Sequence, residues 1–344
     1  MRTTLSAVAL IAFCLSIQAA DEPTLKVGAT IFADYTYQAS PATTDVDGNE
    51  IHPSSFNVNR AYINVTGTLN KRIAFRVTPD VARELGGGSS LSGSQTLRLK
   101  YAYAQLNLDE WMTKGSFVRF GMQQTPYIDY FEQIYRYRFQ GTNFVEREGY
   151  LASSDTGVTM RYVLPKEYGD IHGGFYNGEG YSKAEANDQK ALQIRASLRP
   201  LPKSALGKGL RATVFYDGDN YVDNARRERL VGQVTYEHAR FNAGVDLLST
   251  KDRASASKPQ MDGRGWSVFA TPRLGKGWEL LLRHDHNRPD RNSDVVRKRN
   301  IAGVAYWMPN LQKVTAAVLV DRDALTVTNK PDETRYGVKL LLVF

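Results

Sequence analysis

The stretch RYGVKLLLVF (335–344) carries the pattern that decides the fold. Every second residue, counted back from the end, is apolar: Phe344, Leu342, Leu340, Val338 and Tyr336. The charged residues Lys339 and Arg335 fall on the other positions. Alternation with period two is typical of a β-strand with one apolar and one polar face. The stretch therefore predicts a strand whose two faces meet different media.

The same alternation recurs through most of the chain. Clear examples are IAFRVT (73–78), LQIRASLR (192–199) and WELLLRHD (278–285). There are about 16 such segments, each close to the ~9–11 residues that cross a bilayer as a tilted strand. We therefore expect an all-β protein, a transmembrane antiparallel β-barrel of about 16 strands.

One segment breaks the alternation. In TLRLKYAYAQLNLD (96–109) the polar face changes between Arg98 and Gln105. One extra residue in the strand would restore the pattern, so the segment predicts a β-bulge.

The connections between the strands alternate between long and short. The long polar stretches are 38–55, 80–95, 124–153, 178–189, 217–227, 251–264, 287–297 and 321–333. The short links are 70–71, 110–115, 165–170, 238–240, 275–277 and 308–310, with a longer exception at 199–209. This sorting is typical of a barrel with short periplasmic turns and long outer loops. A soluble β-sandwich is the alternative, but its loops need not sort this way.

The first 20 residues have the features of a signal peptide. Arg2 precedes the apolar run LSAVALIAFCLSI (5–17), and small residues follow at 18–20. We expect the mature barrel domain to span 21–344 in a Gram-negative outer membrane. The single cysteine, Cys14, would leave with the signal, so no disulfide is expected. The net charge of +8 suits anionic solutes or lipopolysaccharide better than nucleic acid in an exported protein.

The polar faces of the strands carry an excess of basic residues. A barrel of about 16 strands leaves an aqueous channel, and a ring of basic side chains favours anions in a pore. We therefore expect a weak anion preference. The alternative is that each arginine pairs with a nearby acid. The predicted pore-wall residues are Arg60, Arg76, Arg119, Arg161, Arg195, Arg211, Arg283, Arg335 and Lys339.

The longest connection, 124–153, is rich in aromatic residues and too apolar for a solvated loop. We expect it to fold into the barrel and narrow the channel. If IYRYRF (134–139) is extended, Arg136 and Arg138 share one face. The alternatives are a loop folded over the outer rim or one buried between subunits. The predicted constriction residues are Arg136, Arg138, Arg147 and Glu132.

Aromatic residues gather near the expected strand ends. Amphipathic rings favour the membrane–water interface, and barrels carry girdles of them there. The residues predicted for these girdles are Trp111, Trp278, Tyr306, Trp307, Tyr336 and Phe344.

Several short motifs together resemble the phosphate-selective porins O and P. They are NRAYINVTGTL (59–69), FVRFGMQQTPY (117–127), GFYNGEG (174–180) and the final Phe344. The resemblance implies a trimeric, 16-stranded porin with a basic inner wall that passes small hydrophilic or anionic solutes. In outer-membrane proteins of this kind the assembly machinery reads the last aromatic residue. Phosphate specificity is not carried over, because Glu146 and Glu148 flank Arg147, and a phosphate preference stays open as an alternative within the anion channel.

The sequence offers little for catalysis or metal binding. It contains no G-x-S-x-G motif, so we expect no enzyme, no catalytic residue and no cofactor. His284 and His286 share a strand face, but RHDHNRPDRNSD (283–294) reads as a strand end and loop, and no metal site is predicted. The alternatives to a channel are a non-conducting barrel that acts as an adhesin or scaffold, or a membrane-embedded hydrolase.

Overall fold

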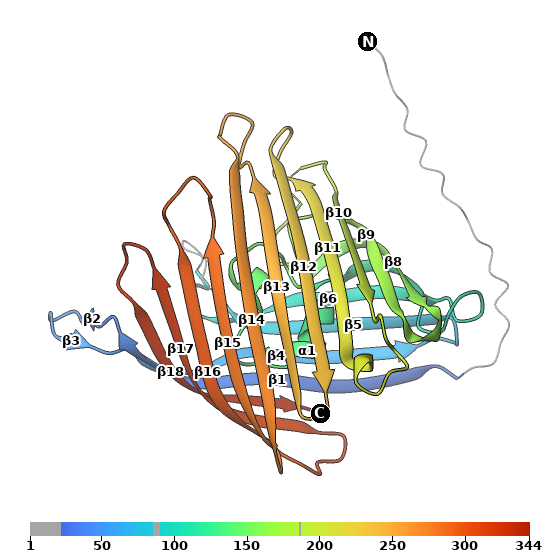
Figure 1. The fold of residues 1–344 in the computed structure, drawn as a ribbon, viewed down its shortest axis with the longest axis horizontal. Coiled ribbons are helices and arrows are strands. Elements are labelled where there is room, and N and C mark those ends of the chain that lie inside the picture. Colours follow the sequence, from blue (N-terminus) through green and yellow to red (C-terminus); the bar gives the residue numbers. More distant parts are fainter. Residues whose placement is uncertain (1–21, 85–89, 186) are drawn as a thin grey trace.

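The computed structural model describes residues 22–84, 90–185 and 187–344, so the predicted signal peptide (1–20) lies outside the described residues. Sixteen strands of the described part form one closed barrel, and every neighbouring pair is antiparallel (Figure 1). The predicted fold class is confirmed. The barrel strands are β1 (Thr24–Ser40), β4 (Ser54–Thr68), β5 (Ile73–Arg83), β6 (Gln95–Asn107), β7 (Phe117–Gln124), β8 (Ser154–Leu164), β9 (Gly169–Tyr176), β10 (Ala191–Leu198), β11 (Leu210–Asn220), β12 (Arg226–His238), β13 (Phe241–Asp252), β14 (Met261–Gly275), β15 (Trp278–Arg288), β16 (Arg297–Trp307), β17 (Thr315–Val327) and β18 (Glu333–Val343).

The remaining elements are short. A two-stranded hairpin of β2 (Thr43–Thr44) and β3 (Glu50–Ile51) forms the first long connection. The two α-helices, α1 (Ile128–Tyr135) and α2 (Phe144–Arg147), both belong to the connection between β7 and β8. No helix among the described residues is long and apolar enough to cross a bilayer.

The last strand closes the barrel against the first. β18 pairs with β1 from Thr30 opposite Val343 onward. The amide of Ala29 donates to the carbonyl of Phe344 at 2.8 Å, and the amide of Phe344 donates back at 3.1 Å. Closure leaves the sheet without an exposed edge, as a strand structure in lipid requires.

Side chains are distributed inside out relative to a soluble protein. On β10 the polar residues Gln193, Arg195 and Ser197 are buried and point inward. Between them Leu192 and Ile194 face outward and are 39% and 44% exposed. A continuous apolar outer belt around a polar interior is the arrangement expected of a barrel in lipid.

The bulge predicted in β6 is present. Across β5 and β6, Thr78 lies opposite Tyr101 but Pro79 lies opposite Leu99, so Lys100 is the extra residue. Because of this irregularity, Lys100 and Tyr101 are both buried instead of alternating between the two faces.

The short turns lie where they are predicted, but several long connections are shorter than expected. β11 continues to Asn220 and β12 begins at Arg226, so only 221–225 separate them where 217–227 is predicted. β17 likewise continues through 321–327. The reason is that a run of polar residues shows only that the segment lies in water. The strands can continue their backbone hydrogen bonds beyond the membrane, so a polar segment can still be part of a strand.

The lipid-facing belt can be tested at Val234, which points outward from β12 and is 52% exposed. Replacing it by Arg places a charge in hydrocarbon, so we expect Val234→Arg to lower the free energy of unfolding by roughly 2–4 kcal/mol. Urea titration of the protein in lipid vesicles measures this, with Val234→Leu as the control. An effect below about 0.5 kcal/mol, normal for an exposed site in water, would contradict a lipid-facing position.

Candidate functional site

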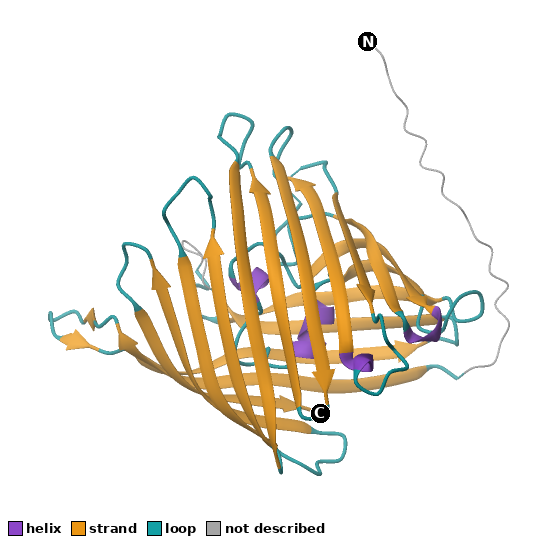
Figure 2. Ribbon diagram, in the orientation of Figure 1, coloured by secondary structure: helices purple, strands orange, loops and turns teal. Residues whose placement is uncertain are grey.

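The connection between β7 and β8 lies within the ring of strands, where Figure 2 shows its helices in purple. Its apolar side chains form one buried cluster with inward residues of β11 to β18. The ring centroid of Tyr127 lies 5.3 Å from that of Phe215 on β11. Those of Phe131 and Tyr135 lie 5.5 and 5.2 Å from that of Phe269 on β14. The aromatic content of this segment is therefore buried against the inner wall.

A second aromatic group holds the segment farther along. The rings of Tyr137 and Phe139 meet Trp307 edge to face at 5.7 and 5.8 Å. The indole N–H of Trp307 donates to the hydroxyl of Tyr137 at 3.2 Å. The prediction that Trp307 belongs to the membrane interface is therefore wrong. On β16 the outward residue is its neighbour Tyr306, which packs on Trp278 at 5.0 Å.

Wall side chains also hold the backbone of the segment. Asn242 on β13 donates to the carbonyl of Ile134 at 2.8 Å, and Arg283 on β15 donates to that of Thr142 at 3.0 Å. These contacts come from strands in the second half of the chain. The segment therefore lies against one side of the interior.

The four predicted constriction residues do not act as one group. α1 ends at Tyr135, and Arg136 adopts a left-handed backbone (φ 65°) with its amide bonded to the carbonyl of Glu132 at 2.8 Å. The expectation of an extended segment with Arg136 and Arg138 on one face is therefore wrong. The Arg136 side chain turns to Glu279 on β15, at 3.3 Å, and lies over the ring of Trp307.

Arg138 and Arg147 are also engaged. Arg138 lies between two loop carboxylates, 3.2 Å from Glu132 and 2.8 Å from Glu146. Arg147 donates to Gln140 at 2.9 Å and lies 3.4 Å from Asp323 on β17. Burial and the nearby cations lower the pKa of Arg147 to about 10. Arg136 and Arg147 thus fasten the segment to the wall, while Arg138 and Glu132 form a pair on its free side.

All nine predicted pore-wall residues project into the interior, but most have a carboxylate partner. Seven of the nine form an ion pair with a nearby carboxylate, as the alternative of local pairing predicts. The pairs are Arg60–Asp80, Arg161–Asp170, Arg195–Asp170, Arg211–Glu237, Arg283–Asp285, Arg335–Glu333 and Lys339–Asp34.

Arg76 and Arg119 are the exceptions. Within the described residues neither has a carboxylate partner. Arg76 donates to Asn64 and Thr78 at 2.8 and 2.9 Å, and Arg119 donates to Gln105 and Gln124 at 2.7 and 3.1 Å. A third unpaired cation, Lys100, lies on the strand between them and was missed from the sequence because the bulge hides its inward direction. We call Arg76, Lys100 and Arg119, on β5, β6 and β7, the basic track.

Aromatic faces hold the basic track in place. The guanidinium of Arg76 lies 4.4 Å from the ring centroid of Tyr101, and that of Arg119 lies 4.0 Å from Phe117. The ammonium of Lys100 lies 4.9 Å from the ring centroid of Tyr62 and donates to its hydroxyl at 3.2 Å. An aromatic ring attracts a cation without cancelling its charge. The rings therefore fix the track in place without neutralising it, and within the track Lys100 is buried.

The free face of α1 is acidic. Asp129 and Arg119 both line a small recess of about 160 Å³ between α1 and β7 to β10. Glu132 lies within electrostatic range of Lys100. Burial raises the pKa of the Glu132 carboxyl to about 7, against the opposing effect of Arg138. Here a basic wall faces an acidic helix face.

A larger cavity, of about 550 Å³, lies between loop residues 138–142 and the strands around the β1–β18 closure. Both signs of charge line it. The acids are Asp34, Asp321 and Asp323, and the bases are Arg60, Arg138, Arg335 and Lys339. Its mixed lining has no strong charge preference of its own.

A family model for the phosphate-selective porins O and P matches residues 26–276. The chain belongs to this porin family. The resemblance seen in the short motifs is thereby confirmed, and family membership indicates an outer-membrane channel and not an enzyme. A search of curated proteins finds no match.

Solved porin structures share the fold at low sequence identity. An anion-selective porin from Comamonas acidovorans is 12% identical, with a TM-score of 0.61 over 94% of this chain and 99% of the other. A loop-deletion mutant of OmpT from Vibrio cholerae is 13% identical, with a TM-score of 0.63 over 94% and 100%. A structure of OmpT described as a trimer form is 12% identical, with a TM-score of 0.55 over 93% and 100%. Identities this low establish the architecture alone.

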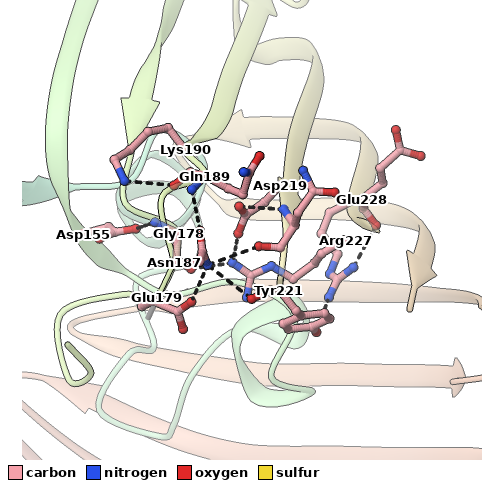
Figure 3. Close-up of polar contacts among 12 residues, drawn as sticks. Asp155, Gly178, Glu179, Asn187, Gln189, Lys190, Asp219, Tyr221, Arg227 and Glu228 are labelled. Atoms are coloured by element: carbon pink, nitrogen blue, oxygen red, sulfur yellow. Dashed lines mark hydrogen bonds and ion pairs between the residues drawn. The ribbon is translucent and has the colours of Figure 1, made fainter. Parts of the chain in front are cut away.

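The outer mouth of the porin is ordered on one side by a polar network (Figure 3). The amide of Gly178 donates to Asp155 at 2.7 Å, and Arg227 joins the carbonyl of Gly178 to Asp219. Asn187 donates to the carbonyl of Tyr221 at 3.2 Å. These bonds tie the connection after β9 to β8, β11 and β12.

In the part of the chain that the structure describes, no group of three or more His, Cys, Asp or Glu could hold a metal ion.

Trp307 gives a test of how the segment is anchored. We expect Trp307→Ala to remove contacts worth roughly 3–5 kcal/mol and to loosen the segment, which raises current noise and changes the single-channel conductance. Planar-bilayer recording measures this. Trp278→Ala, which removes the same side chain from the outer surface, should leave the open-channel current unchanged, and equal effects of the two would argue against this anchor.

Glu132 predicts a pH dependence of ion preference. Because its pKa is raised to about 7, the carboxyl is charged at pH 8 and largely neutral at pH 6. Loss of this negative charge should increase the preference for anions as the pH falls. Reversal potentials at the two pH values measure the change, and Glu132→Gln should abolish most of it. A pH response that persists in that variant would assign the titration to another group.

Proposed function

We propose that this porin forms a water-filled channel for small hydrophilic solutes with a weak preference for anions. The observation that carries the proposal is the basic track, three cations held by aromatic rings and amides without a carboxylate partner. Fixed positive charges on one wall favour negative solutes in the adjacent water. That a similar structure is described as an anion-selective porin agrees with this proposal.

The preference is weak because other charges oppose it. Asp129 and Glu132 lie across from the basic track on α1. The remaining predicted wall cations are neutralised by their partners. Phosphate would pass as one small anion among others, since Arg138 is shared by two glutamates and Arg147 is occupied by Asp323. The loop thus offers no dense, uncompensated cluster for tight phosphate binding.

The connection 124–153 acts in this proposal as the constriction. Glu132 and Arg138 form its charged edge, and Arg136 and Arg147 have the different role of holding it against β15 to β17. The support for this division is the direction of each side chain. The same aromatic packing keeps the segment from leaving the lumen.

We further propose how the porin reaches and occupies the membrane. Residues 1–20 would be cleaved after export, and the assembly machinery would recognise Phe344. The barrel would then lie among lipid and lipopolysaccharide as a homotrimer. The trimer form described for OmpT is consistent with that state. A non-conducting adhesin or scaffold is the remaining alternative, and absence of conductance from folded protein would support it.

The deciding experiment is the reversal potential of the channel in a planar bilayer under a potassium chloride gradient. We expect the wild type to prefer chloride. The double variant Arg76→Gln and Arg119→Gln should bring the reversal potential close to zero, because it removes two uncompensated charges. The control is Lys251→Gln with Lys330→Gln, which removes the same charge from outside the lumen. If the lumen variant and the control behave alike, the basic track does not set ion preference.

A further inference from the structure

The outer surface of β14, β15 and β16 carries basic residues that the channel does not use. Inward and outward residues alternate on each strand, and the inward ones, such as Ser267 and Asp285, are buried. Arg264 and Lys298 are exposed on the opposite face, and Arg288 is half-buried there. They therefore lie outside the barrel wall and cannot contact a solute in the lumen.

Two pairs of these residues lie directly opposite each other across neighbouring strands. Arg264 is the partner of Arg288 between β14 and β15. His286, two residues from Arg288, is the partner of Lys298 between β15 and β16. Like charges in directly opposed positions destabilise a sheet. We call these four residues the outer basic patch.

The compensation by nearby acids is small. Asp294 lies 3.9 Å from Arg288 and is fully exposed. Within the described residues, neither Arg264 nor Lys298 has a carboxylate partner. The directly opposed Arg264 and Arg288, with Lys298 on the next strand, suit a ligand with more than one negative charge.

The patch lies where apolar side chains give way to polar ones toward the long connections. On β15 the outward series runs from Leu282, which is 46% exposed, through His284 to His286. On β14 it runs from Val268 through Trp266 to Arg264. The Trp266 ring stacks on His286 at 5.8 Å, as expected of an aromatic residue at the membrane interface. Long connections face outward in such barrels, so this is the headgroup level of the outer leaflet.

From this placement we infer that the outer basic patch binds the phosphate groups of lipopolysaccharide. Arg264 and Arg288 supply planar forks that can each donate two hydrogen bonds to a phosphate. Lys298 and His286 add donors one row nearer the membrane. The apolar belt directly below, including Trp266 and Leu282, would contact the acyl chains of the same molecule. The lipid would thus relieve the repulsion between Arg264 and Arg288.

The test measures binding of purified lipopolysaccharide to the folded porin in detergent, with native mass spectrometry as the readout. We expect Arg264→Gln with Lys298→Gln to weaken binding roughly thirtyfold, since each basic residue near a membrane surface contributes about 1 kcal/mol. Lys114→Gln with Lys203→Gln, which removes two exposed lysines from the short connections at the other rim, is the charge-matched control and should bind within about twofold of the wild type. Arg264→Lys with Lys298→Arg should retain most of the binding.

Three results would overturn the inference. The first is that the wild type and the Arg264→Gln, Lys298→Gln variant bind lipopolysaccharide equally well. The second is that the wild type binds enzymatically dephosphorylated lipopolysaccharide as tightly as the intact lipid, and the third is that it binds inorganic phosphate that lipopolysaccharide does not displace. Altered gel mobility on heating would first establish that each variant is folded. The ion preference of the patch variant should equal that of the wild type. This result keeps the inference separate from the proposed channel function.

Discussion

The structure depends on one constraint, that no backbone polar group can be left unpaired in lipid. The antiparallel pairing of β18 with β1 meets this constraint for the whole sheet. Once the sheet is closed, each strand has one face toward lipid and one toward the interior. The polar residues that alternate along the chain then have no other place than the lumen, and most pair there with residues of opposite charge.

The interior is asymmetric because one connection occupies part of it. The segment between β7 and β8 buries its aromatic side chains against the second half of the barrel. A cavity remains between loop residues 138–142 and the strands around the β1–β18 closure. On β5 to β7 the cations of the basic track are held by the rings of Tyr62, Tyr101 and Phe117. Elsewhere on the wall, arginines are held by carboxylates that cancel their charge. How a cation is held, more than where it lies along the chain, decides its contribution to the field in the channel.

The sequence predicts the structure well where the environment of each residue, lipid or water, decides its polarity. Lipid selects apolar side chains on alternate positions, so the strands, their approximate number and a bulge between Arg98 and Gln105 could be predicted from periodicity, whereas its position at Lys100 could not. It worked less well at the outer rim, where strands such as β11 and β17 continue above the membrane with polar residues on both faces. Trp307 was assigned to the interface because an aromatic residue near a strand end suits either face, and only its packing on Tyr137 shows which.

The sequence by itself determined the barrel, its strand number, its polar interior and the burial of the segment 124–153, because each follows from local polarity and chain length. Only the tertiary structure decided which basic residues keep their charge. Arg60 and Arg76 look alike in sequence, yet Arg60 meets Asp80 and Arg76 meets Tyr101. The left-handed turn at Arg136 likewise separates it from Arg138 and sends the two side chains to different partners. Pairing of this kind joins residues far apart in the chain, and it is set by register and by the path of the segment through the barrel, which no local pattern records.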